Sequence, residues 1–551
     1  MISDNRRMFV RQMLAIAGAS VAKGAAGTKS STIRRRAITT EDPSQRQQAA
    51  LQMRQDAALA QSVAPVADHF NNGDEDSLPG YIASFTKGLP HTQMGEAESG
   101  TYETLLHALS SGKQADFESL DRGSGSKFVN PKAAFAYEME GADSHRLGMP
   151  GAPGFSSSNA AAEMVELYWQ ALARDDPFTQ YDTSPVTQAA VQDMNGLSVI
   201  PGATVAGQIT PGTLFRCNVV GGLIGPFVSQ FFWKPVPVNS TIVDQKYRSP
   251  AVGINYLTTY PEWLVLQTGV PPFRQWMSDP TPRYIYNGRT LAEWVHYDFL
   301  YQAFHNAALI LLNQSPDTTL NVNPYLNPTN PYKSTKVETG FVTFGAPDIC
   351  CVLGTVSAAA LKAAWFQKWL VHRRLRPEEY GGRVHQTKVG AKQYPVHPDL
   401  LNSTALKATF AANGTYLLPQ AYPEGCPLHP SYPSGHATVS GACSVMLKAF
   451  FDESQLITNT VVASADGLSL LPLDDVPLTV GGEINKLAFN VAMGRDFAGI
   501  HYRSDAEDGL RLGEEVAIAM LSDLVRTYNE DFSGFQFTRL DGTAVQISRN
   551  S

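Results

Sequence analysis

Cysteine is scarce in this chain of 551 residues, which has only five. None of them stands at the spacing of metal-ligating cysteines, so a cysteine-based metal site is excluded. The odd number leaves at least one thiol unpaired within a chain, and the sequence does not determine which of the others form disulfides. Cys426 lies in a loop rich in glycine and proline, whereas we expect the adjacent Cys350 and Cys351 to be buried in the core. The other two are Cys217 and Cys443.

The sequence also lacks a hydrophobic run that we would predict to cross a membrane. Its most apolar stretch, residues 219–233, is too short for a span and is interrupted by three glycines and a proline, so we expect it to lie in the core. Positive charge is in deficit, because 43 lysines and arginines against 51 aspartates and glutamates give a net charge of -8. This balance, together with the absence of a recognised nucleic-acid-binding motif, argues against nucleic acid as a partner.

The N-terminal segment, residues 1–40, differs in composition from the rest. Two adjacent arginines, Arg6 and Arg7, precede an apolar stretch over residues 13–22, a pattern similar to a twin-arginine export signal. This pattern predicts export to the periplasm or the cell exterior. The alternative is a basic N-terminal arm on a cytoplasmic protein, because residues 34–36 form a second arginine cluster.

Proline is plentiful, with 35 residues, and predicts many stiff connections between regular elements. Apolar residues recur at helical spacing, which predicts helices at residues 158–174, 290–313, 354–376, 434–451, 484–495 and 504–527. A small hairpin is predicted to turn at Asp541-Gly542. The sequence therefore predicts an all-α fold with two cores like four-helix bundles, long proline-rich loops and minor β-hairpins. We expect residues 41–551 to form a single domain whose site lies within residues 354–527.

One segment combines the features of an anion-binding site. Pro433 stiffens the chain ahead of a predicted helix, and Ser434 is a favourable N-cap residue. Gly435 has no side chain to shield its N–H group, so the start of this helix offers free donors to an anion. His436 follows directly and can exchange protons near neutral pH. A capped helix with two ordinary histidines, His429 and His436, is the plain structural alternative.

Cationic residues occur upstream of this segment. Lys368, His372 and Arg376 are spaced by four residues, which predicts that they share one stripe of a helix that ends before Pro377. The alternatives are a solvated helix face for the two cations and a structural role for His372.

Downstream, Arg495 and His501 are six residues apart and would face different sides of a continuous helix. Gly499 offers a break that would bring them together. Ser504 and Glu507 form a capping-box pattern, so we expect a new helix to begin there, with His501 in the preceding turn.

These three segments together resemble the vanadium-dependent haloperoxidases and the phosphatases related to them. The similarity extends from about residue 82 to residue 530 and is closer to the algal and cyanobacterial enzymes than to the fungal type. One difference is Gly494, where the family often has serine. The residues that match the family pattern are Lys368, Arg376, Pro377, Pro433, Ser434, Gly435, His436, Arg495, His501 and Asp505.

The resemblance implies vanadate as the cofactor and a role for each of these residues. His501 would bind vanadium; Asp505 is the candidate partner of its other ring nitrogen, and backbone carbonyls are the alternative. His436 would be the acid/base and Lys368 would polarise bound peroxide, so that His436, Lys368 and His501 are the catalytic residues. The vanadate oxygens would be held by the cations and the helix start, namely by Lys368, Arg376, Ser434, Gly435 and Arg495.

The resemblance further implies that hydrogen peroxide oxidises a halide to a hypohalous acid equivalent, which halogenates small organic acceptors. The histidine at position 429 is similar to the residue in the bromide-using algal enzymes, whereas the tryptophan at position 365 is similar to the residue in the chloride-using type. Bromide and iodide are the expected halides, and chloride remains open. The family also implies homo-oligomers, from dimers to dodecamers. Some members have a structural calcium ion, for which residues 321–338 are the segment to inspect.

Two other functions use the same residues. A phosphate-ester hydrolase would use His501 as the nucleophile and His436 as the acid for the leaving group. A non-catalytic oxyanion-binding oligomer would need the cations but neither histidine. Outside the motif, we expect His296 and His305 to be core residues with partners, and Asp496 to pair locally.

Overall fold

The computed structural model describes residues 42–123, 125–313 and 323–549. The predicted export signal and the second arginine cluster lie outside the described residues. The chain divides into two compact units, residues 1–56 and 57–551. The described part of the first unit is the N-terminal portion of helix α2 (Pro43–Val63), and every other element belongs to the second unit.

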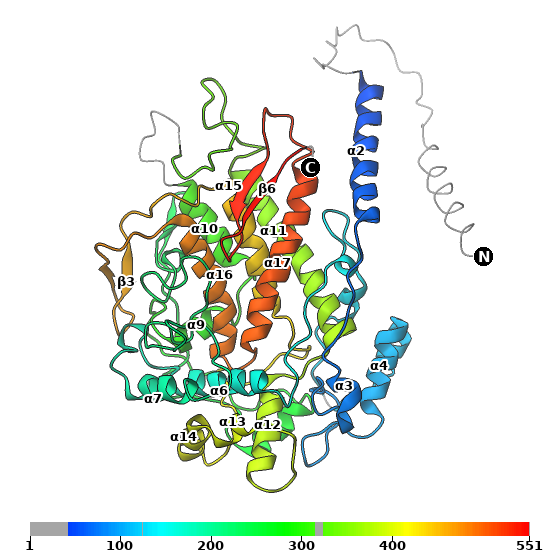
Figure 1. The fold of residues 1–551 in the computed structure, drawn as a ribbon, viewed down its shortest axis with the longest axis vertical. Helices are drawn as coiled ribbons and strands as arrows, with labels where there is room; N and C mark the ends of the chain where they lie inside the picture. Colours follow the sequence, from blue (N-terminus) through cyan, green and yellow to red (C-terminus); the bar gives the residue numbers. More distant parts are fainter. Residues whose placement is uncertain (1–41, 124, 314–322, 550–551) are drawn as a thin grey trace, which may run out of the picture. The chain divides into compact units, whose positions relative to one another are not determined.

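Four helices form the centre of the second unit, and Figure 1 shows them grouped together. They are α11 (Ala346–Phe366), α15 (Gly435–Phe450), α16 (Val480–Phe497) and α17 (Arg503–Leu524). Helix α15 packs against each of the other three and is buried along nearly its whole length. Its small and apolar side chains on every face suit a helix that is covered on all sides.

Two glycines permit the closest contact within this group. A Cβ atom on Gly441 of α15 would lie 2.0 Å from the carbonyl oxygen of Leu510, and one on Gly513 of α17 would lie 2.0 Å from that of Thr438. Both distances are far inside van der Waals contact, so only glycine lets the two backbones approach this closely. Gly441 and Gly513 lie near the middle of their helices. Closer to the start of α15, a Cβ atom on Gly509 of α17 would lie 3.1 Å from the carbonyl oxygen of Ser434, so the close packing extends to the N-terminal end of α15.

Shorter helices and long loops surround this centre. The other helices are α3 (Asp74–Ser77), α4 (Thr101–Ser111), α5 (Gln114–Glu118), α6 (Ser158–Leu172), α7 (Pro185–Met194), α8 (Tyr260–Gln267), α9 (Gly288–Trp294), α10 (Gln302–Leu312), α12 (Pro377–Lys388), α13 (Pro398–Asn402) and α14 (Thr404–Asn413). Single 3-10 turns lie at Pro79–Tyr81, Pro131–Phe135, Ser144–Arg146, Phe178–Gln180 and Gln230–Phe232.

The strands form three small antiparallel pairs. They are β1 (Val236–Val238) with β2 (Thr241–Val243), β3 (Val461–Ala463) with β4 (Leu470–Pro472), and β5 (Phe535–Thr538) with β6 (Ala544–Ile547). The last pair is the hairpin predicted around Asp541-Gly542. The prediction of a helical fold with only minor hairpins is confirmed.

The single helix predicted over residues 290–313 is wrong, because α9 and α10 are separate helices. In the break between them, the carbonyl oxygen of Val295 accepts a hydrogen bond from the guanidinium of Arg495. Asp298, in the same break, lies against His436. Contacts with the site thus interrupt a pattern that would otherwise be helical, and tertiary structure overrides local periodicity here.

The helix predicted over residues 354–376 also ends earlier than expected. Residues 367–372 form a π-helical turn, and Arg373 follows with a left-handed backbone at φ 42°. Pro377 then opens α12, where its fixed φ suits the first helical position. Lys368 and Arg376 therefore do not share one helical stripe. They reach the site from the π-helical turn and from the N-cap of α12.

The capping box predicted at Ser504 and Glu507 is also wrong. Tyr502 precedes α17 as its N-cap residue, and its N–H group donates to Asp505 Oδ2 at 3.1 Å. Glu507 instead pairs with Arg503 at 3.1 Å. The start of α17 therefore depends on a carboxylate that also belongs to the site.

One helix of the described residues, Ala346–His372, is long and apolar enough to cross a membrane by length and composition. Within its most apolar window, 44% is buried in the structure. The sequence predicted residues 219–233 as the most apolar stretch, and this longer run was not predicted. Cys350 and Cys351 lie on this helix, and the expectation that both are core residues is wrong, because Cys350 is half-buried and Cys351 is exposed. All five cysteines are free thiols.

Candidate active site

His501 lies in the turn between α16 and α17, where Gly499 takes a left-handed backbone at φ 84°. Its Nδ1 lies 2.8 Å from Asp505 Oδ2. The same carboxylate accepts hydrogen bonds from Arg374 at 2.9 Å and from the Ser431 hydroxyl. Because a carboxylate accepts hydrogen bonds, the ring proton is assigned to Nδ1, and Nε2 carries the lone pair.

The surroundings of His501 keep its imidazole neutral. Burial lowers the pKa of His501 well below its ordinary value, and the cations Arg376, Lys368 and Arg495 lower that pKa further. Nε2 lies 3.0 Å from a guanidinium nitrogen of Arg376. A neutral imidazole with a fixed tautomer is the form of histidine that binds a metal.

Lys368 and Arg376 are fully buried, and both hold the loop that precedes α15. Lys368 Nζ donates to the carbonyl oxygens of Pro430 and Ser431 at 2.8 and 2.6 Å. Arg376 Nε donates to the carbonyl oxygen of His429 at 2.8 Å. An ammonium group has three donors, so one N–H of Lys368 remains for a ligand.

The third cation, Arg495, reaches the site from the last turn of α16. It donates to the Val295 carbonyl and lies 5.6 Å from the centre of the Tyr422 ring. Its Nε is buried and has no hydrogen-bond partner within the described part of the chain.

These three cations form no ion pair with a carboxylate of the described residues; their main contacts are carbonyl oxygens and rings. Burial lowers the pKa of Lys368 well below its ordinary value, and Arg376 lowers that pKa further. Buried positive charge is costly unless an anion neutralises it. The arrangement therefore fits an anion that lies between the cations and His501.

The start of α15 supplies neutral donors to the same place. Ser434 is the N-cap residue, and its Oγ accepts from the N–H group of Ala437 at 3.4 Å. The N–H groups of Gly435 and His436 have no acceptor among residues 42–123, 125–313 and 323–549. Gly435 packs so closely on Trp365 that an added Cβ would lie 3.1 Å from the indole ring. Free N–H groups at a helix N-terminus favour anion binding.

His436 is paired with an acid from the loop between α9 and α10. Its Nε2 lies 2.8 Å from Asp298 Oδ1, and the two side chains are 13% and 4% exposed. Burial lowers the pKa of His436, whereas Asp298 acts to raise it. Since Asp298 occupies Nε2, the other ring nitrogen, Nδ1, is the one available to exchange a proton.

His429 and Trp365 border the cations. Their ring centres are 4.9 Å apart, and Nδ1 of His429 lies 2.9 Å from a guanidinium nitrogen of Arg376. Burial lowers the pKa of His429 well below its ordinary value, and Arg376 and Lys368 lower that pKa further. With these two, the structure places every predicted site residue in one region.

Sequence reasoning missed three residues of the site's surroundings: Asp298, Arg374 and Glu163. Asp298 is a lone acid inside a stretch that looks helical, and Arg374 is one of two adjacent arginines shortly before Arg376. Glu163 pairs with Arg374 at 2.9 Å from a distant helix, α6. A single sequence carries no spacing signal for contacts of this kind.

The other histidines have structural surroundings. His296 bonds Glu424 at 2.6 Å and stacks on Tyr422 at 3.7 Å, as expected of a core residue with a partner. His305 is only half-buried, and both ring nitrogens of His372 are buried without a partner in the described chain.

The local pairing predicted for Asp496 is wrong. Both of its carboxylate oxygens are buried without a partner among the described residues. Burial raises the pKa of Asp496 well above its ordinary value, and Glu166 raises that pKa further.

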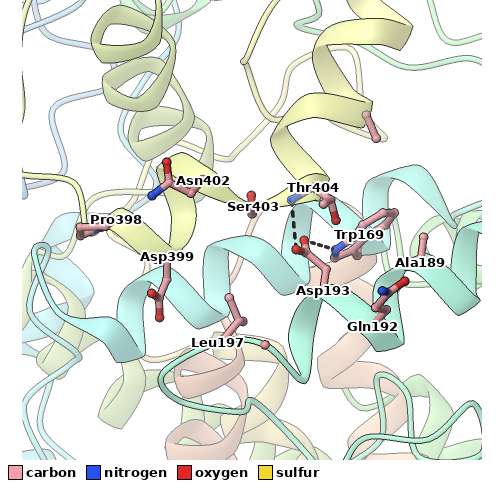
Figure 2. Close-up of a pocket in the computed structure, with 12 residues that line it drawn as sticks. Trp169, Ala189, Gln192, Asp193, Leu197, Pro398, Asp399, Asn402, Ser403 and Thr404 are labelled. Carbon is pink, nitrogen blue, oxygen red and sulfur yellow. Dashed lines mark hydrogen bonds between the residues drawn. The ribbon is translucent and has the colours of Figure 1, made fainter.

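Two other places offer less to a ligand. Residues 321–338, inspected for calcium, contain one carboxylate, Glu338. A surface cavity of about 630 Å³ lies between α6, α7, α13 and α14 (Figure 2). Its central acid, Asp193, already accepts hydrogen bonds from Trp169, Thr404 and Ala405 at 2.9 to 3.0 Å. That carboxylate therefore serves as a cap and brace for the helices around it.

Comparison with known proteins agrees with the geometry. The chain is 35% identical over 500 residues to a vanadium-dependent bromoperoxidase of Ascophyllum nodosum, which covers 87% of this chain and 88% of the relative. The chain belongs to the vanadium-dependent haloperoxidases. A haloperoxidase of Corallina officinalis, also named a vanadium-dependent bromoperoxidase, is 33% identical over 89% of this chain and 96% of its own length.

Further matches agree with this family membership. Residues 349–530 match the family model described as the VCPO second helical-bundle domain. The fold is similar to the homohexameric structure of the second vanadate-dependent bromoperoxidase of Ascophyllum nodosum, with a TM-score of 0.89 and 29% identity. That match covers 97% of this chain and 95% of the other.

The residues present fit vanadate, the cofactor in the family name. Within the part of the chain that the structure describes, three buried cations lack a carboxylate partner, the buried Nε of Arg495 has no acceptor, and the N–H groups at the start of α15 have none either. His501 adds one nitrogen lone pair to a set that otherwise consists of donors to oxygen. This combination suits a tetrahedral oxyanion whose central atom accepts a nitrogen ligand.

Proposed function

We propose that this protein is a vanadate-dependent haloperoxidase, which uses hydrogen peroxide to oxidise halide to a hypohalous acid equivalent. The observation that carries the proposal is the convergence on the Nε2 lone pair of His501 of three buried cations that form no ion pair with a carboxylate of the described residues. Family relatives named bromoperoxidases, at 33–35% identity over most of the chain, support the same activity.

In this proposal His501 would hold the metal through Nε2, and charged and neutral donors would hold the vanadate oxygens. Lys368, Arg376 and Arg495 supply the charge, and Ser434 and Gly435 supply the hydroxyl and amide donors. When bound, vanadate supplies a Lewis acid that activates hydrogen peroxide towards attack by halide. The remaining N–H of Lys368 lies ready to donate to an oxygen at this centre.

His436 is the proposed acid/base. Its Nε2 is bonded to Asp298 Oδ1, so Nδ1 is the ring nitrogen that would take up or release a proton. The side chain is 13% exposed, which gives that proton a path to solvent.

Bromide and iodide are the proposed halides, with chloride as a further candidate. The centre of the Trp365 ring lies 6.0 Å from Lys368 Nζ, and His429 Nδ1 lies 2.9 Å from a guanidinium nitrogen of Arg376. Both side chains therefore border the place where halide would meet peroxide. We assign these two residues to halide preference. Released hypohalous acid then reacts with small organic acceptors without a dedicated pocket.

We also propose that the protein forms a homo-oligomer, as its homohexameric relative does. Exposed apolar side chains next to α11, those of Val337, Phe341 and Val342, are available for contacts between copies. Light scattering of the purified protein tests this proposal, and a monomer at micromolar concentration would contradict it.

Two further expectations, export and a calcium site, stay proposals. Export through a twin-arginine-like signal is tested by cell fractionation with Arg6 and Arg7 both replaced by lysine. A calcium ion in residues 321–338 is tested by metal analysis of the purified protein.

The activity is tested by adding vanadate to the apo-protein and measuring bromination of a dye with peroxide and bromide. We expect activity that requires vanadate and that phosphate inhibits by competition. Hydrolysis of a chromogenic phosphate ester without bromination would show that the site is a phosphatase. Binding of vanadate without either reaction would show that the protein only binds the oxyanion and is not an enzyme.

A further inference from the structure

Behind His501 lies a chain of buried contacts that reaches a distant helix. The carboxylate of Asp505 accepts from His501, from the Tyr502 N–H and from the Ser431 hydroxyl through Oδ2. Its other oxygen, Oδ1, accepts from Arg374 NH1 at 2.9 Å. Within the described part of the chain, Arg374 is therefore the one side chain that holds Oδ1.

Arg374 is itself held from three sides. Its NH2 donates to Glu163 Oε2 at 2.9 Å, and its NH1 donates to the Ser504 hydroxyl at 2.9 Å. Its guanidinium lies 3.7 Å from the centre of the Tyr502 ring. The second oxygen of Glu163 accepts the Ser504 N–H at 2.6 Å, so Glu163 joins Arg374 to the start of α17. Arg374 and Glu163 are 5% and 6% exposed, and the contacts are shielded from water.

We propose that Arg374, anchored by Glu163, is a positioning residue for the metal ligand His501. It holds the Asp505 carboxylate in the orientation that keeps the imidazole proton on Nδ1 and leaves Nε2 for vanadium. Partners of this kind orient the ligand and fix its tautomer in metal sites generally. The proposal rests on the proposed function for the identity of the metal, whereas the tautomer of His501 is a property of this chain alone.

A consequence for selectivity follows from the chemistry of the two anions. Phosphate and vanadate are both tetrahedral oxyanions and would use the same three cations. Only vanadate also forms a coordinate bond to Nε2, so only vanadate depends on the tautomer. Arg374 and Glu163 therefore set the preference for vanadate over phosphate and not the binding of oxyanions as such.

The chain offers a matched control on the same helix. Glu166 lies three residues after Glu163 on α6 and pairs with Arg503, whose Nε donates to Glu166 Oε2 at 2.8 Å. The two side chains are 2% and 6% exposed, as buried as the first pair. Neither of them contacts Asp505. Breaking this second pair therefore measures how much stability is lost with a buried ion pair between α6 and α17, while the contacts of His501 stay unchanged.

The first measurement compares dissociation constants of vanadate and phosphate for the apo-protein by calorimetry. In Glu163→Gln and Arg374→Gln we expect the vanadate constant to rise about tenfold or more, as is typical when the partner of a metal ligand is lost. We expect the phosphate constant to change less than about threefold, because the cations remain. Arg374→Lys should recover part of the vanadate affinity. Glu166→Gln should leave both constants near the wild-type values while lowering the melting temperature.

The second measurement is nitrogen NMR of the apo-protein labelled with ¹⁵N-histidine. We expect His501 to carry its proton on Nδ1 in the wild type and in Glu166→Gln, and a mixture of tautomers in Glu163→Gln and Arg374→Gln. Equal losses of vanadate and phosphate affinity, or the same effects in Glu166→Gln, would overturn the proposal. So would a folded Arg374→Gln protein with the wild-type tautomer. If the wild type bound no vanadate, the proposed function would fail, and the tautomer would still decide whether Arg374 positions His501.

Discussion

The two histidines of the site each bond an aspartate at 2.8 Å, yet the two pairs are built differently. His501 and Asp505 are four residues apart, and their side chains are 2% and 0% exposed. His436 and Asp298 come from distant parts of the chain, and the His436 side chain is 13% exposed. Asp505 has hydrogen bonds on both oxygens, whereas Oδ2 of Asp298 has no partner among the described residues.

The difference matches two tasks that an imidazole can perform. At His501 the surrounding cations oppose protonation, and the carboxylate is braced from several sides, so the ring keeps one tautomer and offers one lone pair. At His436 the aspartate acts to raise the pKa, which keeps protonation accessible despite burial. A braced, neutral ring suits binding, and a partly exposed ring with a less constrained partner suits proton transfer.

The largest effect is expected for His501→Ala. We expect loss of detectable bromination and at least a hundredfold weaker vanadate binding by equilibrium dialysis, because the nitrogen ligand is gone and vanadate is then held by charge alone. Phosphate binding should persist, since Lys368, Arg376 and Arg495 remain. Full activity in this variant would show that His501 is not the metal ligand.

His436→Ala is expected to separate the two tasks. The bromination rate should fall by roughly two to four orders of magnitude, the usual contribution of a general acid/base. Vanadate affinity should stay within about threefold of wild type, because His436 is not a metal ligand in this assignment. Steady-state kinetics of the loaded enzyme and dialysis of the apo-protein give the two numbers. A loss of affinity as large as that of His501→Ala would contradict the division.

Asp298→Asn should change the pH profile more than the maximal rate. Asp298 raises the pKa of His436, so its neutral replacement lowers that pKa below the wild-type value. The limb of the pH–rate profile that reports His436 should therefore move to lower pH. The corresponding replacement Asp505→Asn should weaken vanadate binding instead. A profile unchanged in Asp298→Asn would show that the titrating group is another one.

The smallest effect is expected for the residues that border the cations. His429→Phe removes the ring nitrogen that accepts from Arg376 at 2.9 Å, and Trp365→Phe removes the indole N–H that donates to the Val129 carbonyl at 3.1 Å. We expect a change of several-fold in the ratio of bromide to chloride rates, with vanadate affinity little changed. If both variants kept the wild-type ratio of bromide to chloride rates, these residues would not determine halide preference.

The chemistry-bearing residues were accessible to sequence reasoning because each is marked by its neighbours. Ser434 and Gly435 follow a proline and open an apolar helix, and Gly499 offers the turn in which His501 lies. The partners of these residues were not accessible in the same way. Asp298 lies in a stretch with helical periodicity, and only the contact of Arg495 with the α9–α10 break shows why that helix stops.

Helix boundaries show the same limit. The spacing of Lys368 and Arg376 predicted a shared helix face, but a π-helical turn and the left-handed Arg373 separate them. The two cations still reach one place, because the loop carbonyls of residues 429–431 accept hydrogen bonds from both. Local spacing therefore predicted which residues matter, and the path by which they meet depended on contacts between segments far apart in the chain.

The sequence by itself determined the helical class, the three segments that carry charge and imidazole, and the Asp505 partner of His501, because these depend on residue type and short-range spacing. The tertiary structure alone decided that Asp298 serves His436, that Arg374 and Glu163 brace Asp505, and that no carboxylate of the described residues neutralises the three cations. Those features depend on which side chains are buried together, and burial is a property of the packed helices that no local pattern encodes.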